Sequence, residues 1–376
     1  MNSFLKPAGK VDKPFLFITS ALVLFGFFIF LSASFGILTR ENGPSLSQII
    51  FNQFLFGLIF GSIAAFISSR VPYRLWRKYS FYFLLFGILL TLLVFVPRLG
   101  FSHGGATRWL SLGPISLQPA EILKLAFVVY FASWLSGVYR EIGSFKYGLL
   151  PFCGLIAVVG AVLLSQPDTG TFVSIFVTAV TMFVLAGGKI RDILIIALIG
   201  ILSLTFLAWS RPYVMTRITT FLNPENDPRG SSYQIQQSLI AIGSGGLWGR
   251  GFGQSVQKFN YLPEPIGDSI FAVAAEEFGF IGGLFLIALF TAFGLRGFYI
   301  ARHAPDVFGG LLVSGITTLI IVGSFMNIGS MLAVFPLSGQ PLLFVSHGGT
   351  ALLIALFSTG IVLNISRYAK KPTANN

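Results

Sequence analysis

Acidic side chains beside apolar segments are the residues of this sequence best placed to do chemistry. Asp168 and Asp268 each stand directly before such a segment, and Glu276 and Glu277 follow Asp268 inside its segment. Charged groups within apolar segments usually mark a functional site, because they are costly to place in a membrane. An aspartate at the start of a helix can instead cap it. From the residues alone, capping is the favoured interpretation of both aspartates.

The two adjacent glutamates predict a polar environment. Consecutive helical residues point about 100° apart, so Glu276 and Glu277 cannot both face lipid. At least one must face protein or water. This predicts a polar cavity that opens to the outer leaflet.

A third acidic residue is paired with a cation. In Gln118-Pro-Ala-Glu-Ile-Leu-Lys124, Pro119 suits the first turn of a helix, and Glu121 and Lys124 fall on one face of it. Two interpretations remain open: an intrahelical pair that neutralises itself, or charges that face a functional cavity.

The sequence contains little that would predict other kinds of site, such as a metal cluster or a nucleotide-binding loop. His103, His303 and His347 fall in different parts of the chain, and the single Cys153 lies in an apolar run, so no metal cluster is predicted. The glycine-rich stretch 243–253 follows no strand, which favours a flexible turn over a nucleotide-binding loop. No nucleophile elbow or Walker loop occurs.

Membrane helices must position these residues. Of the 376 residues, 54% are hydrophobic and 10% are charged, against about a quarter charged in a soluble domain. Apolar blocks of about 20 residues, enough to cross a bilayer, recur along the chain. They lie near 15–38, 48–69, 79–97, 119–139, 147–165, 170–187, 190–208, 269–295, 307–332 and 343–366. The predicted fold is all-α, a polytopic membrane protein with about ten transmembrane helices in one domain over 1–376.

The basic residues indicate which way the helices run. Of the 25 Lys and Arg, sixteen fall on the side that holds both termini, and three fall in the short loops of the other side. Five more lie in the long loop, and Lys124 lies within a span. The excess places both termini in the cytoplasm. The formal charge of +12 is therefore mainly an orientation signal, and nucleic-acid binding is not expected.

The longest stretch outside the predicted spans, about 209–267, opens on the outer face. Its length indicates that function concentrates there. Ile235, Leu239 and Ile242 have helical spacing within it, which predicts a helix along the membrane surface.

Five ordered motifs resemble those of the SEDS family, the bacterial peptidoglycan polymerases of shape, elongation, division and sporulation. They are Gly105-Ala-Thr-Arg-Trp-Leu-Ser-Leu-Gly113, Gln118-Pro-Ala-Glu-Ile-Leu-Lys124, Gln166-Pro-Asp-Thr-Gly-Thr171, Leu262-Pro-Glu-Pro-Ile-Gly-Asp268 with Glu276-Glu-Phe-Gly279, and Asn327-Ile-Gly329 followed by Pro336-Leu-Ser-Gly-Gln-Pro341 and Phe344-Val-Ser-His-Gly-Gly349. The resemblance runs from about residue 15 to 367. The Tyr-Leu-Pro-Glu-Pro and Ile-Gly-Ser-Gly-Gly stretches are more similar to division-type than to elongation-type members.

Two positions depart from the family pattern. The family usually has His-Thr before its loop aspartate, where this chain has Ile266-Gly267, and usually Tyr where this chain has His347. The first departure leaves the aspartate in place and concerns its local hydrogen bonds.

The resemblance implies a ten-helix glycosyltransferase that polymerises lipid II on the outer face of the bacterial cytoplasmic (inner) membrane, in cell division. Asp268 matches the catalytic aspartate, which would act as general base on the acceptor sugar hydroxyl. A cation must stabilise the departing pyrophosphate. Lys124 is the predicted cation, oriented by Glu121, and Arg108 and Arg217 are the outer-loop candidates.

The resemblance leaves other contributions open. A divalent cation, Mg²⁺ or Mn²⁺, is a further candidate cofactor, and Trp109 either packs on the substrate or anchors the loop at the interface. A single carboxylate base fits transfer better than hydrolysis, which commonly uses a flanking pair.

Two alternative functions use the same features. The charged cavity could carry lipid II across the bilayer, which would make the protein a flippase. The chain could also be a non-catalytic scaffold for a transpeptidase. The partner that the resemblance implies is a class B penicillin-binding protein.

Overall fold

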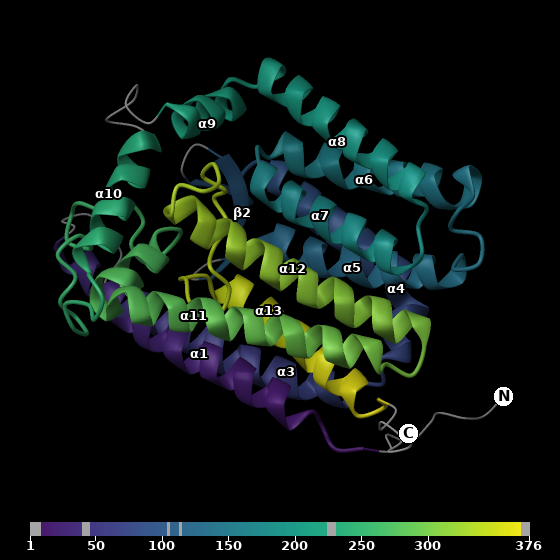
Figure 1. The fold of residues 1–376 in the computed structure, drawn as a ribbon, viewed down its shortest axis with the longest axis horizontal. Coiled ribbons are helices and arrows are strands. Elements are labelled where there is room, and N and C mark those ends of the chain that lie inside the picture. Colours follow the sequence, from purple (N-terminus) through teal and green to yellow (C-terminus); the bar gives the residue numbers. More distant parts are fainter. Residues whose placement is uncertain (1–8, 40–45, 104–105, 113–114, 224–230, 370–376) are drawn as a thin grey trace.

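The computed structural model describes residues 9–39, 46–103, 106–112, 115–223 and 231–369 as a bundle of long helices (Figure 1). The spanning helices are α1 (Lys13–Ser34), α3 (Gly61–Arg70), α4 (Arg74–Leu92), α5 (Pro119–Gly137), α6 (Leu150–Ser165), α7 (Thr169–Leu185), α8 (Ile190–Ser210), α11 (Ile270–Arg302), α12 (Val307–Met331) and α13 (Gly349–Ser366). Short elements extend several of them: η1 (Phe35–Thr39), α2 (Leu46–Asn52), η2 (Gln53–Phe60), η3 (Leu93–Phe95) and η4 (Phe145–Leu149).

The predicted all-α membrane fold is confirmed. Within the described residues, nine helical segments are long and apolar enough to span a membrane, and α7, with 17 residues, is a shorter apolar helix. Together they account for the ten predicted segments. The last helix begins at Gly349 rather than near 343, because residues 336–348 form an irregular segment at the outer end.

Burial is uneven across the bundle. Helices α12 and α5 are buried over most of their length, whereas α8 buries only Asp192 and Ile196. Helix α13 packs along α3, α4 along α5, and α11 along α1 and α12. Figure 1 shows α8 along the outside of the bundle, beside α6 and α7.

Polar contacts bring the two ends of the described chain together. The Asp12 amide donates to Ser366 Oγ at 3.0 Å, and the Gly9 amide donates to the Arg367 carbonyl at 3.0 Å. Asp12 also forms a salt bridge with Arg296 of α11, with 2.8 Å between Oδ2 and Nη2. The chain therefore enters α1 and leaves α13 at the same end of the bundle, as the helix count predicts.

The opposite end carries structure that the sequence patterns did not reveal. Strands β1 (Gly100–His103), β2 (Ala106–Leu112) and β3 (Ile115–Leu117) form an antiparallel sheet in that order. Helices α9 (Pro212–Leu222) and α10 (Ser231–Ser244) belong to the long loop, and they gather with β2 at this end in Figure 1. The helix predicted over 231–242 is thus confirmed, but Ile235 is buried and α10 packs on α11.

The glycine-rich loop docks into a break in α11. Gly279 has φ +68° and ψ −167°, which interrupts the helix. The freed amides of Phe280 and Ile281 donate to the carbonyls of Gly246 and Leu247 at 2.8 and 3.2 Å. The stretch expected to be a flexible turn is therefore paired with the helix backbone.

Candidate active site

Asp268 lies at the outer end of the bundle, directly before α11. Three consecutive carbonyls anchor its backbone: Ile266 accepts from the His347 amide at 2.7 Å, and Gly267 accepts from Ser346 Oγ at 2.7 Å. Asp268 itself accepts from Asn327 Nδ2 at 2.8 Å. The local hydrogen bonding of this unusual Ile-Gly sequence is thus supplied through main-chain atoms.

The capping interpretation is right for one aspartate and wrong for the other. Asp168 caps α7, because its Oδ1 accepts from the Thr171 amide at 3.3 Å. The N-cap of α11 is Ser269, and no side-chain capping bond is present there. Among the described residues, no hydrogen bond to the Asp268 carboxylate is found, so the group remains available for chemistry.

Two arginines converge on this carboxylate. Arg217 extends from α9, where its Nη1 donates to the Ser338 carbonyl at 3.4 Å. Gly339, with φ +64°, lies between Arg217 and Asp268: a Cβ added there would be 3.4 Å from Arg217 Nη2 and 4.0 Å from Asp268 Oδ2. Glycine suits this position because its positive φ is unfavourable for other residues.

Arg108 reaches the same region from β2. Its Nε donates to the Gln166 carbonyl at 3.2 Å, its Nη2 donates to the Pro167 carbonyl, and its Nη1 is 3.9 Å from Asp168 Oδ1. The α6–α7 turn therefore holds this guanidinium in place through main-chain and side-chain oxygens. A fixed cation is well suited to binding a phosphate group.

Burial and neighbouring charges shift the pKa of Asp268. Burial and the neighbouring Glu264 carboxylate raise the pKa of Asp268 to about 6, while Arg217 and Arg108 oppose the rise. Burial and the nearby Arg108 lower the pKa of Arg217. A carboxylate with a pKa near the operating pH is effective as a general base.

Hydrogen bonds fix the irregular segment 336–348 to α7, α12 and η2 beside the site. Gln340 Nε2 donates to Thr171 Oγ1 at 2.8 Å, and Asn327 Nδ2 donates to the Gln340 carbonyl at 2.8 Å. Gln53, from η2, donates to the Ser346 carbonyl at 3.1 Å. These positioning contacts were not predicted individually, although an amide side chain inside an apolar run, as at Gln53 and Asn327, was a usable signal.

Lys124 and Glu121 form a buried pair within α5. Lys124 Nζ lies 2.8 Å from Glu121 Oε1, and both side chains are at most 6% exposed. The charges that act most strongly on the pKa of Asp268 are those of Glu264, Arg217, Arg108 and Asp168. The geometry thus agrees with the self-neutralising interpretation of this pair, and a role for Lys124 toward pyrophosphate stays a prediction.

The remaining predicted contributors are placed but not assigned a role. Trp109 is half-buried on β2, opposite Phe101 of β1, and its contact with substrate stays a prediction. His347 stacks on Phe30, with ring centroids 5.9 Å apart, and burial lowers its pKa to about 4. It is therefore neutral at physiological pH.

The polar cavity expected at Glu276 and Glu277 is wrong, because the segment 255–258, which follows the glycine-rich stretch, fills it. Glu276 accepts from Ser255 Oγ at 2.6 Å and from the Val256 amide at 3.0 Å. Lys258 Nζ lies 2.7 Å from Glu277 Oε1. Both glutamates do face protein, as predicted, but their partners are loop amides and side chains rather than water.

Lys258 completes this buried network. Its Nζ also donates to Ser32 Oγ of α1 at 3.0 Å and to the Gly253 carbonyl at 2.9 Å. The network joins α1, the loop and α11, about two turns along α11 from Asp268. It was missed because its members are far apart in the sequence.

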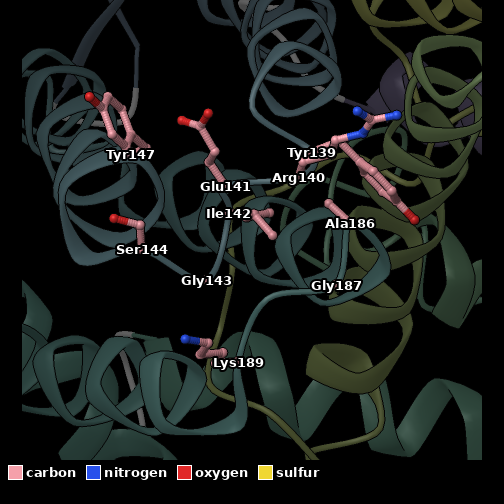
Figure 2. Close-up of a pocket in the computed structure, with 10 residues that line it drawn as sticks. All are labelled: Tyr139, Arg140, Glu141, Ile142, Gly143, Ser144, Tyr147, Ala186, Gly187 and Lys189. Atoms are coloured by element: carbon pink, nitrogen blue, oxygen red, sulfur yellow. The ribbon is translucent and has the colours of Figure 1, made fainter.

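A large hollow lies away from Asp268, at the inner end of the bundle. It measures about 740 Å³ and is formed by the loops after α5 and α7. Figure 2 shows Glu141 and Tyr147 on one side of it and Lys189 on the other. Within the described parts of the chain, no three His, Cys, Asp or Glu residues cluster as a metal site would require.

Comparison with known proteins relates this chain to one family. The family described as cell cycle protein, FTSW_RODA_SPOVE, matches residues 13–371. Stage V sporulation protein E of Bacillus subtilis (strain 168) is 41% identical over 318 residues, which cover 85% of this chain and 87% of that protein. The probable peptidoglycan glycosyltransferase FtsW of Geobacter metallireducens is 36% identical over 366 residues, 97% of each chain.

Solved structures show the same fold. A chain from a study of "Structural coordination of polymerization and crosslinking by a peptidoglycan synthase complex" matches with a TM-score of 0.78 and 26% identity, covering 95% of this chain and 98% of that one. The rod shape determining protein RodA of Thermus thermophilus matches with a TM-score of 0.70 and 25% identity, covering 96% and 98%.

Proposed function

Because the chain belongs to the cell cycle protein family of FtsW, RodA and SpoVE, we propose that Asp268 is the general base of a lipid II polymerase. The protein is a peptidoglycan glycosyltransferase, as its FtsW relatives are named. The observation that carries the role of Asp268 is its uncapped carboxylate, which shares one site with Arg217 and Arg108 and has a pKa raised to about 6.

The reaction follows from these positions. The acceptor sugar hydroxyl loses its proton to the Asp268 carboxylate while its oxygen attacks the anomeric carbon of the donor sugar. The bond between that carbon and the pyrophosphate oxygen breaks, and the electron pair leaves with the undecaprenyl pyrophosphate. Base catalysis of this kind contributes about 10²-fold to 10⁴-fold, and Arg217 and Arg108 stabilise the leaving charge.

The two arginines are favoured over Lys124 as the pyrophosphate ligands. Lys124 is already neutralised by Glu121 within α5, whereas Arg217 and Arg108 both act electrostatically on Asp268. A contribution from a divalent cation stays a prediction, because no three acidic, His or Cys residues of the described chain cluster as a protein metal site would require. Any such cation would have to take most of its ligands from phosphate oxygens and water, as Mg²⁺ commonly does.

The cellular setting follows from the family. The protein is polytopic, and we place it in the bacterial cytoplasmic membrane with Asp268 on the outer face, in agreement with the distribution of Lys and Arg. We assign it to cell division, in line with its FtsW relatives. A transpeptidase is the proposed partner, since a structural neighbour comes from a complex that coordinates polymerization and crosslinking.

Polymerisation of purified lipid II in detergent tests the proposal. Detergent abolishes the two leaflets, so a flippase would leave lipid II unchanged, as would a scaffold. Wild-type protein is expected to form glycan polymer, and Asp268→Asn is expected to form none while keeping its thermal transition. The matched control, Asp306→Asn, alters an aspartate that caps α12 at the inner end. Undiminished polymer from Asp268→Asn would remove this residue from the mechanism.

A further inference from the structure

The inner hollow of about 740 Å³, formed by the loops after α5 and α7, takes no part in the proposed reaction. Its volume is within the range of small-molecule sites, about 300–1,000 Å³. Charged and hydroxyl-bearing side chains stand in its wall: Tyr139, Arg140, Glu141, Ser144, Tyr147 and Lys189. A recess of this size with polar walls is suited to a charged ligand.

Two cations of this hollow are left without a counter-ion. Among the residues that the structure describes, neither Arg140 nor Lys189 forms a salt bridge, whereas neighbouring Arg191 is paired with Asp192 at 3.0 Å. Glu141 is the one acidic residue in the described lining, and Figure 2 shows its carboxylate pointing away from Lys189. The hollow therefore carries an excess of positive charge, which an anion would neutralise.

The backbone of both loops fixes the position of Lys189. Its aliphatic stem crosses Gly143, since a Cβ added there would lie 2.6 Å from Lys189 Cε and 3.2 Å from Cδ. Its carbonyl accepts from the amides of Asp192 and Ile193, as expected of the N-cap of α8. The side chain is thus anchored in one loop and packed against the other, so less rotational freedom is lost when its ammonium group binds an anion.

Main-chain donors lie beside the two cations. Helix α8 begins after Lys189, and η4, which leads into α6, begins after Ser144; within the described residues neither N-cap makes a side-chain capping bond. First-turn amides have no partner within their helix, and such amides bind anions. Helices α5 and α7 end at the same hollow, but carbonyls of their last turns accept from turn amides, namely those of Trp134, Phe183 and Val184. The main-chain groups at the hollow therefore favour an anion over a cation.

The hollow lies at the level of the membrane surface. Phe145 and Ile190, the first residues of η4 and α8, are 60% and 77% exposed and begin segments apolar enough to span a membrane. Tyr139 and Tyr147 line the hollow, and tyrosine is enriched at membrane interfaces. The distribution of Lys and Arg places this end of the bundle in the cytoplasm. Apolar side chains that face lipid thus adjoin a cationic recess that faces water.

We propose that the inner hollow binds the phosphate headgroup of an anionic phospholipid from the cytoplasmic leaflet, with Arg140 and Lys189 as its cationic ligands. The assignment goes beyond the proposed function and does not depend on it. Cationic pockets between membrane helices on the cytoplasmic side commonly bind anionic headgroups. The acyl chains of such a lipid would lie against Phe145 and Ile190, and its head would link the loop after α5 to the loop after α7.

Native mass spectrometry of the full chain in detergent tests the assignment by counting bound lipids. Titration with phosphatidylglycerol should reveal one site that is tighter than the others. Phosphatidylcholine with the same acyl chains has no net charge and should not fill this site at the same concentrations. In Arg140→Gln/Lys189→Gln the affinity of the site should fall about thirtyfold, which is about fivefold for each cation removed.

A matched control removes one arginine and one lysine elsewhere at the inner end. Arg77 and Lys78 are exposed near the start of α4, outside the hollow, so Arg77→Gln/Lys78→Gln should keep the tight site. All four side chains are exposed, so both double variants should keep the wild-type unfolding midpoint in detergent alone. Equal weakening of lipid binding by the two double variants would reduce the effect to general surface charge and overturn the assignment.

Competition separates a lipid from other anions. Inorganic phosphate or a hexaglutamate peptide, at the concentration of the lipid, should not displace phosphatidylglycerol from the tight site. Displacement by phosphate would make the hollow a site for small soluble anions, and displacement by the peptide would make it a docking site for an acidic protein segment. Either result would overturn the lipid assignment.

Photo-crosslinking in vesicles locates the lipid without detergent. Phosphatidylglycerol with a diazirine close to its glycerol should label peptides from residues 138–150 and 185–193. The labelling should persist in Arg77→Gln/Lys78→Gln and be lost in Arg140→Gln/Lys189→Gln. Labelling spread evenly over the helices, or unchanged in Arg140→Gln/Lys189→Gln, would show that no lipid site exists at the hollow.

Discussion

At the scale of single residues, the site depends on a carboxylate whose pKa is raised toward neutral pH. Asp268 is flanked by Glu264 on one side and by Arg217 and Arg108 on the other. The arginines favour the ionised form, but burial and Glu264 outweigh them, so the pKa rises from an ordinary value of 3.8 to about 6. The group is thus ionised at neutral pH and still basic enough to accept a proton.

The pH dependence of polymerisation should report this pKa. A base must be ionised to act, so kcat/KM should be flat above about pH 7 and fall about tenfold per pH unit below about 6. Initial rates of polymerisation in detergent between pH 4.5 and 8 measure this limb. An acid limb near pH 4, the ordinary range of a carboxyl, would mean that burial does not perturb Asp268 as the structure indicates.

Removal of the neighbouring carboxylate should shift this limb. Glu264→Gln deletes a negative charge that raises the pKa of Asp268, so the limb should move to lower pH. The same substitution at Glu141→Gln, an exposed glutamate at the inner end, should leave the limb in place. A shift toward higher pH in Glu264→Gln would contradict the electrostatic account.

At the scale of elements, the buried Lys258–Glu277 pair holds the loop against α1 and α11. Lys258→Met leaves the Glu277 charge buried without its cation, and such a change costs about 3–5 kcal/mol of stability. The double variant Lys258→Met/Glu277→Gln should regain much of the loss, because no uncompensated charge remains. Thermal unfolding in detergent measures both.

The same variants should expose the loop to protease. Cleavage within residues 245–262 should accelerate in Lys258→Met, while Lys189→Met, at an exposed inner lysine, should match wild type. A double variant no more stable than Lys258→Met would show that the pair does not act as a unit.

The break in α11 requires glycine. At Gly279 the backbone lies in a region that is essentially restricted to glycine and costs other residues about 1–3 kcal/mol. An added Cβ would also come within 2.3 Å of the Gly249 nitrogen and 2.5 Å of the Leu247 carbonyl oxygen. Gly279→Ala should therefore lower the midpoint of thermal unfolding and loosen the loop.

Gly323 in α12 provides the matched control. It is buried in a helix, yet a Cβ there would meet nothing within 4 Å. Gly323→Ala should be neutral or stabilising by up to about 1 kcal/mol, the usual helical gain from glycine to alanine. Equal destabilisation by both variants would argue against a special backbone at Gly279.

The elements show what the sequence could and could not predict. The spans were predictable, because hydrophobic runs of bilayer length have few other uses. The docking of the loop was not, because it depends on Ser32, Lys258 and Glu277 meeting across most of the chain. The rule that paired glutamates cannot face lipid was correct, but it does not tell a water-filled cavity from a loop that supplies donors.

The candidate site was likewise predictable from the sequence in part only. Asp268, Arg108 and Arg217 could be singled out as candidates from motif and location, but only the structure shows that the two arginines act on the Asp268 carboxylate and that Lys124 is paired with Glu121. The family role of Asp268 rests on its motif, and its release from a capping role rests on the geometry of Ser269.

At the scale of the whole molecule, the proposed reaction on the outer face requires that the bundle crosses the membrane in a single orientation. Strand β2 and helix α9, which carry Arg108 and Arg217, lie at the end of the bundle opposite to the joined ends of α1 and α13 (Figure 1). Asp268 shares that end, since the Arg217 and Arg108 charges act on it. The excess of basic residues places those joined ends in the cytoplasm. The substrate headgroup and the proposed transpeptidase partner must then meet the site from the outer side.

Directional labelling tests this orientation. In a Cys153→Ala background, Trp248→Cys places a thiol on the loop at a position that is 80% exposed, and Lys189→Cys places one at the inner hollow. In right-side-out vesicles, a membrane-impermeant maleimide should label position 248 directly and position 189 only after detergent is added. The reverse pattern would put Asp268 in the cytoplasm, where a polymerase of the outer face could not work.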